Sequence, residues 1–114
     1  MIALKTEIFV KAYVKRLDIN GIPAYVLRHG DDDAGDLIVK LCTLDGRASL
    51  FRREYDLGTG ERHWACVLSS SEAEVDVSIT KQCGFDPDLW VLEIEDAKGR
   101  HFLDLKSSPK IDKF

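Results

Sequence analysis

The sequence predicts one α+β domain, in which two helices pack against a mostly antiparallel or mixed sheet of about five strands. Two observations support this prediction: helical periodicity occurs in two separate segments, and several short β-rich runs are bounded by turn residues. The predicted order is α-β-β-β-β-α-β, with a further short strand at the end. A chain of 114 residues has the common size of one domain, and neither a repeat nor a linker divides residues 1–114.

The first helix is predicted over Thr6 to Ile19, where apolar residues recur every three or four positions and charged residues gather opposite them. Asn20 and Gly21 are expected to end this helix, because both tolerate the left-handed conformation that stops a helix. The second helix is expected to begin after residues 69–71, which are three serines, and to run to about residue 84. A serine hydroxyl there can cap free backbone N–H groups.

The strands are predicted from alternating or β-branched runs that turn residues separate. Four of them, over residues 24–28, 36–42, 47–54 and 62–68, are expected to form a meander. A fifth strand is predicted over residues 89–95, and a turn at Lys98-Gly99 is expected to lead into a last strand over residues 101–105. The polar residues 106–114 are expected to form a frayed tail.

Composition and charge exclude several classes of protein. Hydrophobic residues at 45% and charged residues at 32% are typical of a globular chain, and no apolar run has the length of a signal peptide or membrane span. The net charge is −4, and the basic residues are scattered, so nucleic-acid binding is not expected. The odd number of cysteines, Cys42, Cys66 and Cys83, favours reduced, buried thiols and a cytoplasmic location.

Several sequence strings, taken together, resemble one bacterial family. They are LKTEIFVKAYVKRL near the start, GDDDAG, VKL and LDG in the middle, and FDPDLWVLEIEDAKGRHFLD over residues 85–104. This combination is similar to the alphaproteobacterial family called domain of unknown function 1491 (DUF1491). The resemblance implies a short, stand-alone cytoplasmic protein. Since the family has no assigned catalytic residues, none are carried over to this chain.

The sequence lacks the spacing that metal and cofactor sites require. Asp31, Asp32 and Asp33, with Asp36 nearby, could offer oxygen ligands to Mg²⁺ or Ca²⁺, but consecutive residues do not converge on one point. A solvated loop is therefore the favoured interpretation. The three histidines, His29, His63 and His101, are too far apart to form a short metal-ligand motif, and no nucleophile elbow, phosphate loop or dinucleotide fingerprint occurs. We therefore predict neither a metal nor a cofactor.

The turn before the fifth strand holds two acidic side chains beside an aromatic one. Asp86 and Asp88 flank Pro87, which restrains the backbone, and Trp90 follows. Such a turn could form a binding edge, although the favoured alternative is that Asp86 caps the turn. Glu93 and Glu95 share one face of the strand and are expected to meet water.

The first helix carries more apolar surface than one sheet needs, because its apolar side chains cover roughly 240° where about 100° suffices. We therefore expect a homodimer through this helix. Arg16 lies inside the apolar arc, and Asp76 lies on an apolar face of the second helix. An unpaired buried charge is costly, so we expect the two to pair with each other or to meet partners at an interface. Exposure at the edge of each face is the alternative.

The leading hypothesis for function is a non-enzymatic domain that works by protein interaction. The first rival is an enzyme in which Asp86 and Asp88 or the 31–36 loop act with Arg28, Arg52 or Arg53 on a small anionic metabolite. The second is a small-ligand sensor with Trp64 and Trp90 as an aromatic wall. The candidate binding residues are Arg16, Arg28, Asp76, Asp86, Asp88 and Trp90, and no catalytic residue is predicted.

Overall fold

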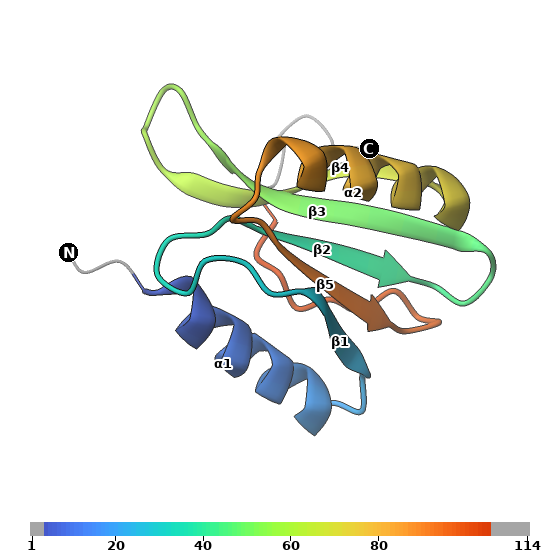
Figure 1. Ribbon diagram of the computed structural model, residues 1–114. Coiled ribbons are helices and arrows are strands. Elements are labelled where there is room, and N and C mark those ends of the chain that lie inside the picture. The colour runs from blue at the N-terminus through green and yellow to red at the C-terminus, as the bar shows by residue number, and fades with distance from the viewer. Residues whose placement is uncertain (1–3, 106–114) are drawn as a thin grey trace.

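The computed structural model describes residues 4–105. Two helices and five strands follow one another in the predicted order α-β-β-β-β-α-β, which confirms the α+β class (Figure 1). They are α1 (Thr6–Ile19), β1 (Ala24–Arg28), β2 (Leu37–Cys42), β3 (Arg47–Tyr55), β4 (Arg62–Ser71), α2 (Glu72–Phe85) and β5 (Trp90–Glu95). The predicted frayed tail, residues 106–114, lies outside the described residues.

The five strands form one mixed sheet in the order β1-β5-β2-β3-β4. Neighbours pair antiparallel except β5 and β2, which run parallel. The predicted four-strand meander is therefore wrong for β1, because β5 lies between β1 and β2. Apolarity on both faces explains this position: Val91, Leu92 and Ile94 are all buried, so β5 fits inside the sheet, whereas the more exposed β1 fits its edge.

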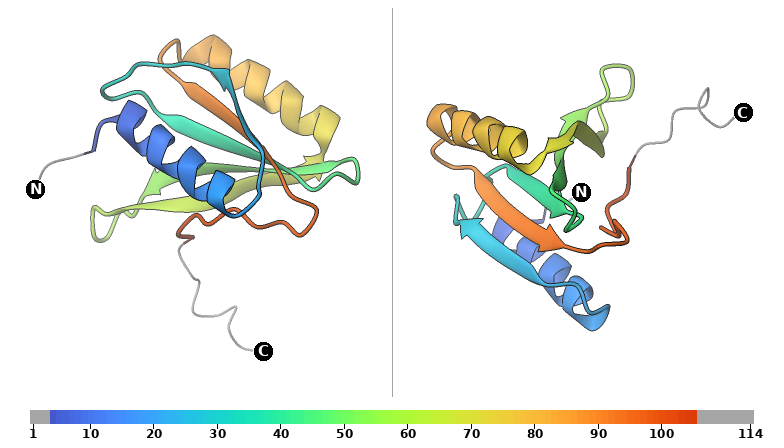
Figure 2. Two further views of the ribbon diagram at one scale, coloured as in Figure 1. Left: turned by 90° about the horizontal axis from the view of Figure 1, so that it is seen from below. Right: turned by 90° about the vertical axis from the view of Figure 1, so that its right-hand side faces the viewer.

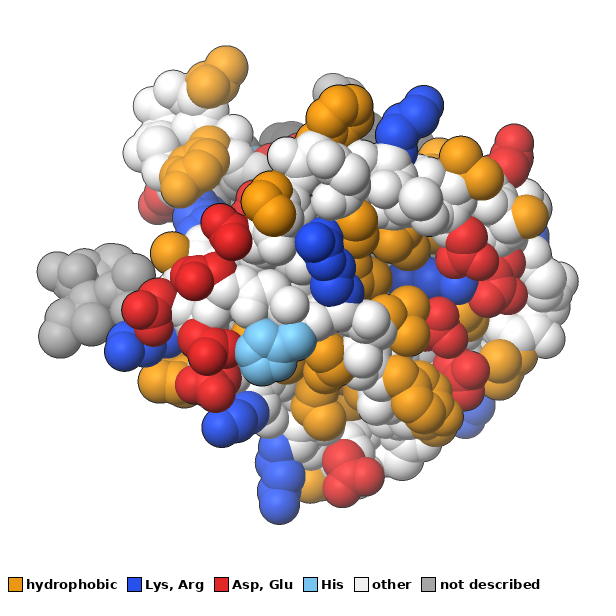
Figure 3. Space-filling view, viewed as in Figure 1, with side chains coloured by type: hydrophobic (Ala, Val, Ile, Leu, Met, Phe, Trp, Pro, Cys, Tyr) orange, Lys and Arg blue, Asp and Glu red, His pale blue; other side chains and the backbone are white. Residues whose placement is uncertain are grey.

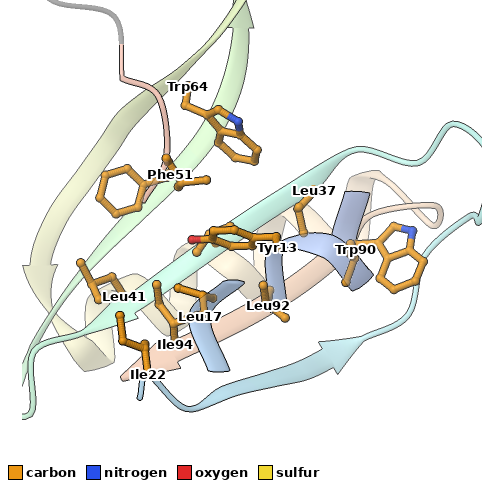
Figure 4. Close-up of a cluster of buried hydrophobic side chains, with 13 residues drawn as sticks. Tyr13, Leu17, Ile22, Leu37, Leu41, Phe51, Trp64, Trp90, Leu92 and Ile94 are labelled. Carbon is orange, nitrogen blue, oxygen red and sulfur yellow. The ribbon is translucent and has the colours of Figure 1, made fainter. Parts of the chain in front are cut away.

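The helices cover opposite faces of the sheet, which gives the molecule three layers (Figures 1 and 2). Strand β2 alternates between two cores: Leu37, Val39 and Leu41 join the cluster under α1, and Ile38 joins the one under α2. In the larger cluster, Tyr13 and Leu17 of α1 pack on side chains from the central strands (Figure 4). Neither helix within residues 4–105 has the length and apolar character needed to cross a membrane.

The predicted last strand over residues 101–105 is wrong. Within the described chain this segment makes only one isolated bridge, from Leu105 to Trp64. Phe102 has a φ of 54°, which interrupts an extended backbone, and the carbonyl of His101 accepts a 2.7 Å hydrogen bond from the Tyr13 hydroxyl. Because Leu103 is also buried in the core, the segment packs beside α1 instead of forming a strand.

Asp96, directly after β5, gives a testable pH dependence. Its carboxylate accepts bonds from Arg100 Nε (3.0 Å), Nη2 (2.9 Å) and backbone N (2.7 Å). The side-chain bonds, and then the backbone bond, lower the pKa of Asp96 from 3.8 to about 2. Because the folded pKa is the lower one, this stabilisation is present above pH 3.8 and is lost as the pH falls toward 2.

We expect Asp96→Asn to flatten the fall in unfolding free energy across this pH range. Urea denaturation at a series of pH values measures the unfolding free energy as a function of pH. The exposed Asp104→Asn is the matched control and should keep the wild-type slope of unfolding free energy against pH. Equal slopes in the two variants would contradict the role of Asp96 in this pH dependence.

Candidate functional site

A lysine surrounded by three carboxylates lies between the sheet and α2. Lys40 occupies the middle of the central strand β2, and its side chain is only 3% exposed. Its Nζ lies 2.6 Å from Asp76 Oδ1, 2.8 Å from Glu72 Oε2 and 3.2 Å from Glu93 Oε1. The first turns of α2 supply two of these acids, and Glu93 sits beside Lys40 in the β2–β5 register. Each of the three ammonium protons thus has one acceptor.

The electrostatics of this lysine cluster hold it in its charged form. Burial by itself would lower the pKa of Lys40, but hydrogen bonds to Asp76, Glu72 and Glu93 outweigh burial and raise that pKa above its usual value. The hydrogen bond from Lys40 also lowers the pKa of Glu72. A lysine that keeps its proton does not act as a nucleophile or a general base, so the cluster has no catalytic chemistry of that kind.

The same cluster contains a possible trio of metal ligands, formed by Cys42, Glu72 and Glu93. Their ligand atoms lie within 4.8 Å of one another. The group does not fit a metal, because the Lys40 ammonium already binds both carboxylates. Burial, followed by the negative charge of Glu93, also raises the pKa of the Cys42 thiol to about 12, whereas metal binding requires the thiolate. The lysine therefore takes the place that a cation would occupy.

The predicted pairing of Arg16 with Asp76 within one chain is wrong. Asp76 belongs to the lysine cluster, while Arg16 lies over the ring of Phe102, 5.0 Å from its centroid. The two residues belong to helices on opposite faces of the sheet (Figure 2), and no ion pair between them occurs within residues 4–105. The cationic partner of Asp76 is Lys40 of β2, and the Asp76 side chain remains 53% exposed.

Arg28, Asp86 and Asp88 come together at the C-terminal end of α2. The Arg28 guanidinium donates hydrogen bonds to the carbonyl oxygens of Cys83 (3.3 Å), Asp86 (3.1 Å) and Pro87 (3.3 Å). These carbonyls have no acceptor role inside the helix, so the arginine satisfies the helix end. Asp86 Oδ1 accepts a 3.0 Å bond from the Asp88 backbone N–H, as the turn-capping alternative predicted.

Trp90 fastens the start of β5 to the loop that precedes β2. Its indole Nε1 donates a 2.7 Å hydrogen bond to the carbonyl of Asp31, and its ring lies 4.0 Å from the His29 ring. Trp90 is buried, with 3% of its surface exposed. These contacts give it a structural part in holding two segments that are 59 residues apart.

The carboxylates of the 31–36 loop do not converge on one point. Asp31 Oδ2 accepts bonds from two backbone N–H groups of its own turn, and Asp32 Oδ1 lies 2.6 Å from His29 Nε2. Asp36 instead lies 3.4 Å from Arg52 and 3.4 Å from Arg62. In the view of Figure 3, acidic side chains form two separate groups, one over the 31–36 loop and one beside α2. The separate partners of the loop carboxylates agree with a solvated loop.

Two expectations about burial are corrected. Cys42 is buried and Cys83 half-buried, but Cys66 is exposed. An irregularity in the pairing of the edge strand β4 with β3 shifts the register, which pairs Phe51 with Cys66 and breaks the predicted alternation. Glu93 was expected to meet water, yet its side chain is 18% exposed because it joins the lysine cluster.

Two hollows lie on the surface next to α1. The first, which we call the α1–β1 groove, has a volume of about 640 Å³ and includes Val14, Val26 and Trp90 in its lining. The second, which we call the arginine pocket, has a volume of about 930 Å³ and includes Arg53 and Trp64. Trp64 and Trp90 therefore line different hollows, and the predicted common aromatic wall is not formed.

Comparisons with known proteins identify relatives without an assigned activity. A family model described as a protein of unknown function (DUF1491) matches residues 4–104. A crystal structure of a DUF1491 family protein from Caulobacter crescentus is 37% identical, with a TM-score of 0.81, over 93% of this chain and 100% of that one. An NMR structure of a DUF1491 family protein from the same organism is 39% identical, with a TM-score of 0.81, over 95% and 100%.

A solution structure of protein Atu0922 from A. tumefaciens is 29% identical, with a TM-score of 0.78, over 95% of this chain and 98% of that one. Both organisms are alphaproteobacteria. The comparison with curated proteins gives no match. The fold and the family are therefore established, and the function has to be argued from the geometry of this chain.

Proposed function

Because the chain belongs to the DUF1491 family, whose members have no assigned activity, we propose from its own geometry that it is a non-enzymatic domain that binds an extended peptide segment of a protein partner. The observation that supports this proposal is the open edge of β1 beside the α1–β1 groove. Strand β1 ends the sheet order, so one of its two sides has no strand neighbour within residues 4–105. An open strand edge can accept a further strand from another chain.

The side chains of β1 fit such a role. Tyr25, Val26 and Leu27 are three consecutive large apolar residues with 49%, 47% and 54% of their surfaces exposed. Tyr25 and Val26 precede an irregularity in the β1–β5 pairing between Val26 and Arg28, so these two side chains point to opposite faces and offer apolar contacts on both sides of an added strand. Pro23 before β1 and the charged Arg28 at its end limit pairing to the middle of this edge, where the exposed apolar side chains favour a binding surface.

The α1–β1 groove would give the added strand its specificity. Its floor is apolar, and the groove-facing stripe of α1 carries Glu7, Lys11, Lys15 and Asp18. An extended peptide sends alternate side chains to the same face. We therefore expect the partner to have apolar residues at every second position, flanked by polar residues that meet the charged rim.

The chemistry of the titratable groups supports a role without catalysis. The pKa of Lys40 and the pKa of Cys42 are both raised away from the range in which these groups act as nucleophiles. All three cysteines are free, which supports the cytoplasm as the compartment of the protein.

The proposal is tested with a displayed library of random peptides selected on the full chain. A selected peptide, made synthetically, is expected to shift the backbone amide resonances of β1 and α1 and to protect β1 amides from hydrogen exchange. Val26→Lys places a charge in the groove and should weaken binding by about tenfold. Val77→Lys, at an exposed valine of α2, is the matched control and should leave affinity within about twofold. Shifts confined to α2 or β4, or equal loss in both variants, would refute the proposal.

A second copy of the chain is the alternative occupant, through α1. Leu4 and Ile8 are 59% and 47% exposed, which favours a covered helix. However, a two-fold axis near the middle of α1 would bring Glu7 toward Asp18 and Lys11 toward Lys15, so like charges would meet. This repulsion between like charges favours a bound peptide over a second copy of the chain. Sedimentation equilibrium should give the monomer mass of 12.9 kDa, and a dimer dispersed by Ile8→Glu would support the alternative.

A further inference from the structure

The arginine pocket is distinct from the α1–β1 groove and lies on another side of α1. Its walls come from α1, from the paired ends of β3 and β4, and from the segment of residues 102–105. Aromatic rings of Phe9, Trp64 and Phe102 alternate there with the guanidinium groups of Arg16 and Arg53. The pocket thus combines flat apolar walls with cationic groups.

The Arg53 guanidinium lies against two stacked aromatic rings. Its guanidinium carbon lies 5.3 Å from the centroid of the Phe9 ring and 5.4 Å from that of Trp64. These two rings are themselves stacked, with centroids 6.0 Å apart and planes inclined by 26°. Aromatic contact on this scale positions the guanidinium without satisfying its N–H donors.

One buried donor at the wall of the pocket has no hydrogen-bond partner. Within residues 4–105, the two buried side-chain nitrogen or oxygen atoms without a partner are Arg53 Nε and His63 Nδ1. Strands β3 and β4 pair Arg53 with Trp64 and Glu54 with His63, so the His63 ring lies on the other face of the two strands from Arg53. Burying a donor without an acceptor costs free energy, so Arg53 Nε indicates a missing acceptor in the pocket.

Arg52, the neighbour of Arg53 in β3, has hydrogen-bond partners for its guanidinium. Arg52 points to the opposite face, where Nη1 donates a 2.5 Å bond to Gln82 Oε1 and Nη2 lies 3.4 Å from Asp36 Oδ2. By contrast, burial and then the positive charge of Arg62 lower the pKa of Arg53. A bound anion would relieve both effects, because it supplies the opposite charge and accepts hydrogen bonds.

We propose that the arginine pocket binds a small planar molecule that carries a carboxylate or phosphate group. The anionic group accepts a hydrogen bond from Arg53 Nε. The planar body of the ligand lies against Phe9 and Phe102. Three acidic side chains also line the pocket: Glu61 and Asp104 are exposed on the rim, and the half-buried Asp56 accepts hydrogen bonds from the backbone N–H groups of Gly58 and Thr59 in its own turn.

The test uses the full chain and four probes: phenyl phosphate, benzoate, the neutral benzamide and inorganic phosphate. The indole N–H resonances of the two tryptophans, assigned with Trp64→Phe, report on the arginine pocket and on the α1–β1 groove separately. Phenyl phosphate and benzoate are expected to shift the Trp64 signal with an affinity at least about tenfold above that of benzamide, and to leave Trp90 unchanged.

Arg53→Gln should weaken binding of both anions by about tenfold or more, whereas Arg52→Gln, its neighbour on the opposite face, should change affinity by less than about threefold. If Arg53→Gln fails to fold, Arg53→Lys takes its place, with an expected loss of about fivefold, because lysine keeps the charge but lacks the Nε donor. Equal affinity for benzamide, equal affinity for inorganic phosphate, shifts at Trp90 instead of Trp64, or equal losses in the two arginine variants would each overturn the proposal.

Discussion

Replacing Lys40 with Met is expected to lower the free energy of unfolding by about 3 kcal/mol at neutral pH. The change keeps the apolar stem but removes the ammonium, which leaves Glu72, Asp76 and Glu93 close together without a cation. Breaking a fully buried ion pair typically costs about 3–5 kcal/mol. The lower end applies here, because the side chains of Glu72 and Asp76 are 45% and 53% exposed and water screens part of their repulsion.

The pH dependence of this cost distinguishes lost charge pairing from lost packing. In wild-type protein the pKa of Glu72 is lowered, so its stabilisation is present above pH 4.5 and is lost as the pH falls below that value. In Lys40→Met the crowded carboxylates favour their protonated forms, so the variant loses less stability in acid. The gap between the two proteins should therefore narrow from pH 7 toward pH 4, as followed by urea denaturation.

Two further variants make this prediction sharper. Lys11→Met removes an ammonium from an exposed pair with Glu7, in which the lysine side chain is 77% exposed, and should cost less than about 0.5 kcal/mol. Adding Glu93→Met to Lys40→Met should restore part of the stability, because the least exposed uncompensated carboxylate is then removed. A cost for Lys40→Met as small as that of Lys11→Met would contradict the role of the lysine cluster.

The elements themselves could be predicted because their signals are local. The periodicity of residues 6–19 and the turn residues at Asn20-Gly21 gave the bounds of α1, and residues 24–28 gave those of β1. The serine at position 71 caps α2 as expected, with its hydroxyl accepting a 3.3 Å bond from the Glu74 N–H. The bounds of α1 and β1 and the cap of α2 depend on residues that are close to each other in the sequence.

The position of β5 and the lysine cluster could not be predicted, because both depend on contacts distant in sequence. Lys40 is 32 residues from Glu72 and 36 from Asp76, and only the insertion of β5 beside β2 brings Glu93 to it. One signal was present in the sequence: Lys40 interrupts an otherwise apolar strand. A charge in such a strand requires partners, by the same argument that singled out Asp76.

The arginine pocket was missed for a related reason. Arg53 was expected only as an anion holder alongside the acids of the 31–36 loop or the 86–88 turn, whereas the structure places it against the stacked rings of Phe9 and Trp64. The alternation of β3 puts Arg52 and Arg53 on opposite faces, and only the position of α1 shows which face is enclosed. The sequence pattern alone does not distinguish the two arginines.

Gly30→Ala is expected to lower the free energy of unfolding by about 3 kcal/mol. A methyl group at this position would overlap the carbonyl oxygen of Asp88 and would lie 2.6 Å from Trp90 Cδ1 and 2.7 Å from the carbonyl carbon of Leu89. The crowding involves backbone atoms that cannot move away, because the Asp88 carbonyl accepts a 3.0 Å bond from the Asp31 N–H. Relief would require β5 to separate from the loop that precedes β2.

The same substitution at Gly84 should have the opposite sign. Gly84 lies in the last turns of α2, and a methyl group there meets nothing within 4 Å, so Gly84→Ala should raise stability by about 0.5–1 kcal/mol through its better helix propensity. Urea denaturation of both variants measures the two changes in unfolding free energy. The comparison is direct if the slope of that free energy against urea concentration is unchanged. A cost below about 1 kcal/mol for Gly30→Ala would mean that the loop can move away from β5. The position of Trp90 would then not be fixed by the backbone contact at Asp88, and its indole bond to Asp31 would have to hold the two segments together.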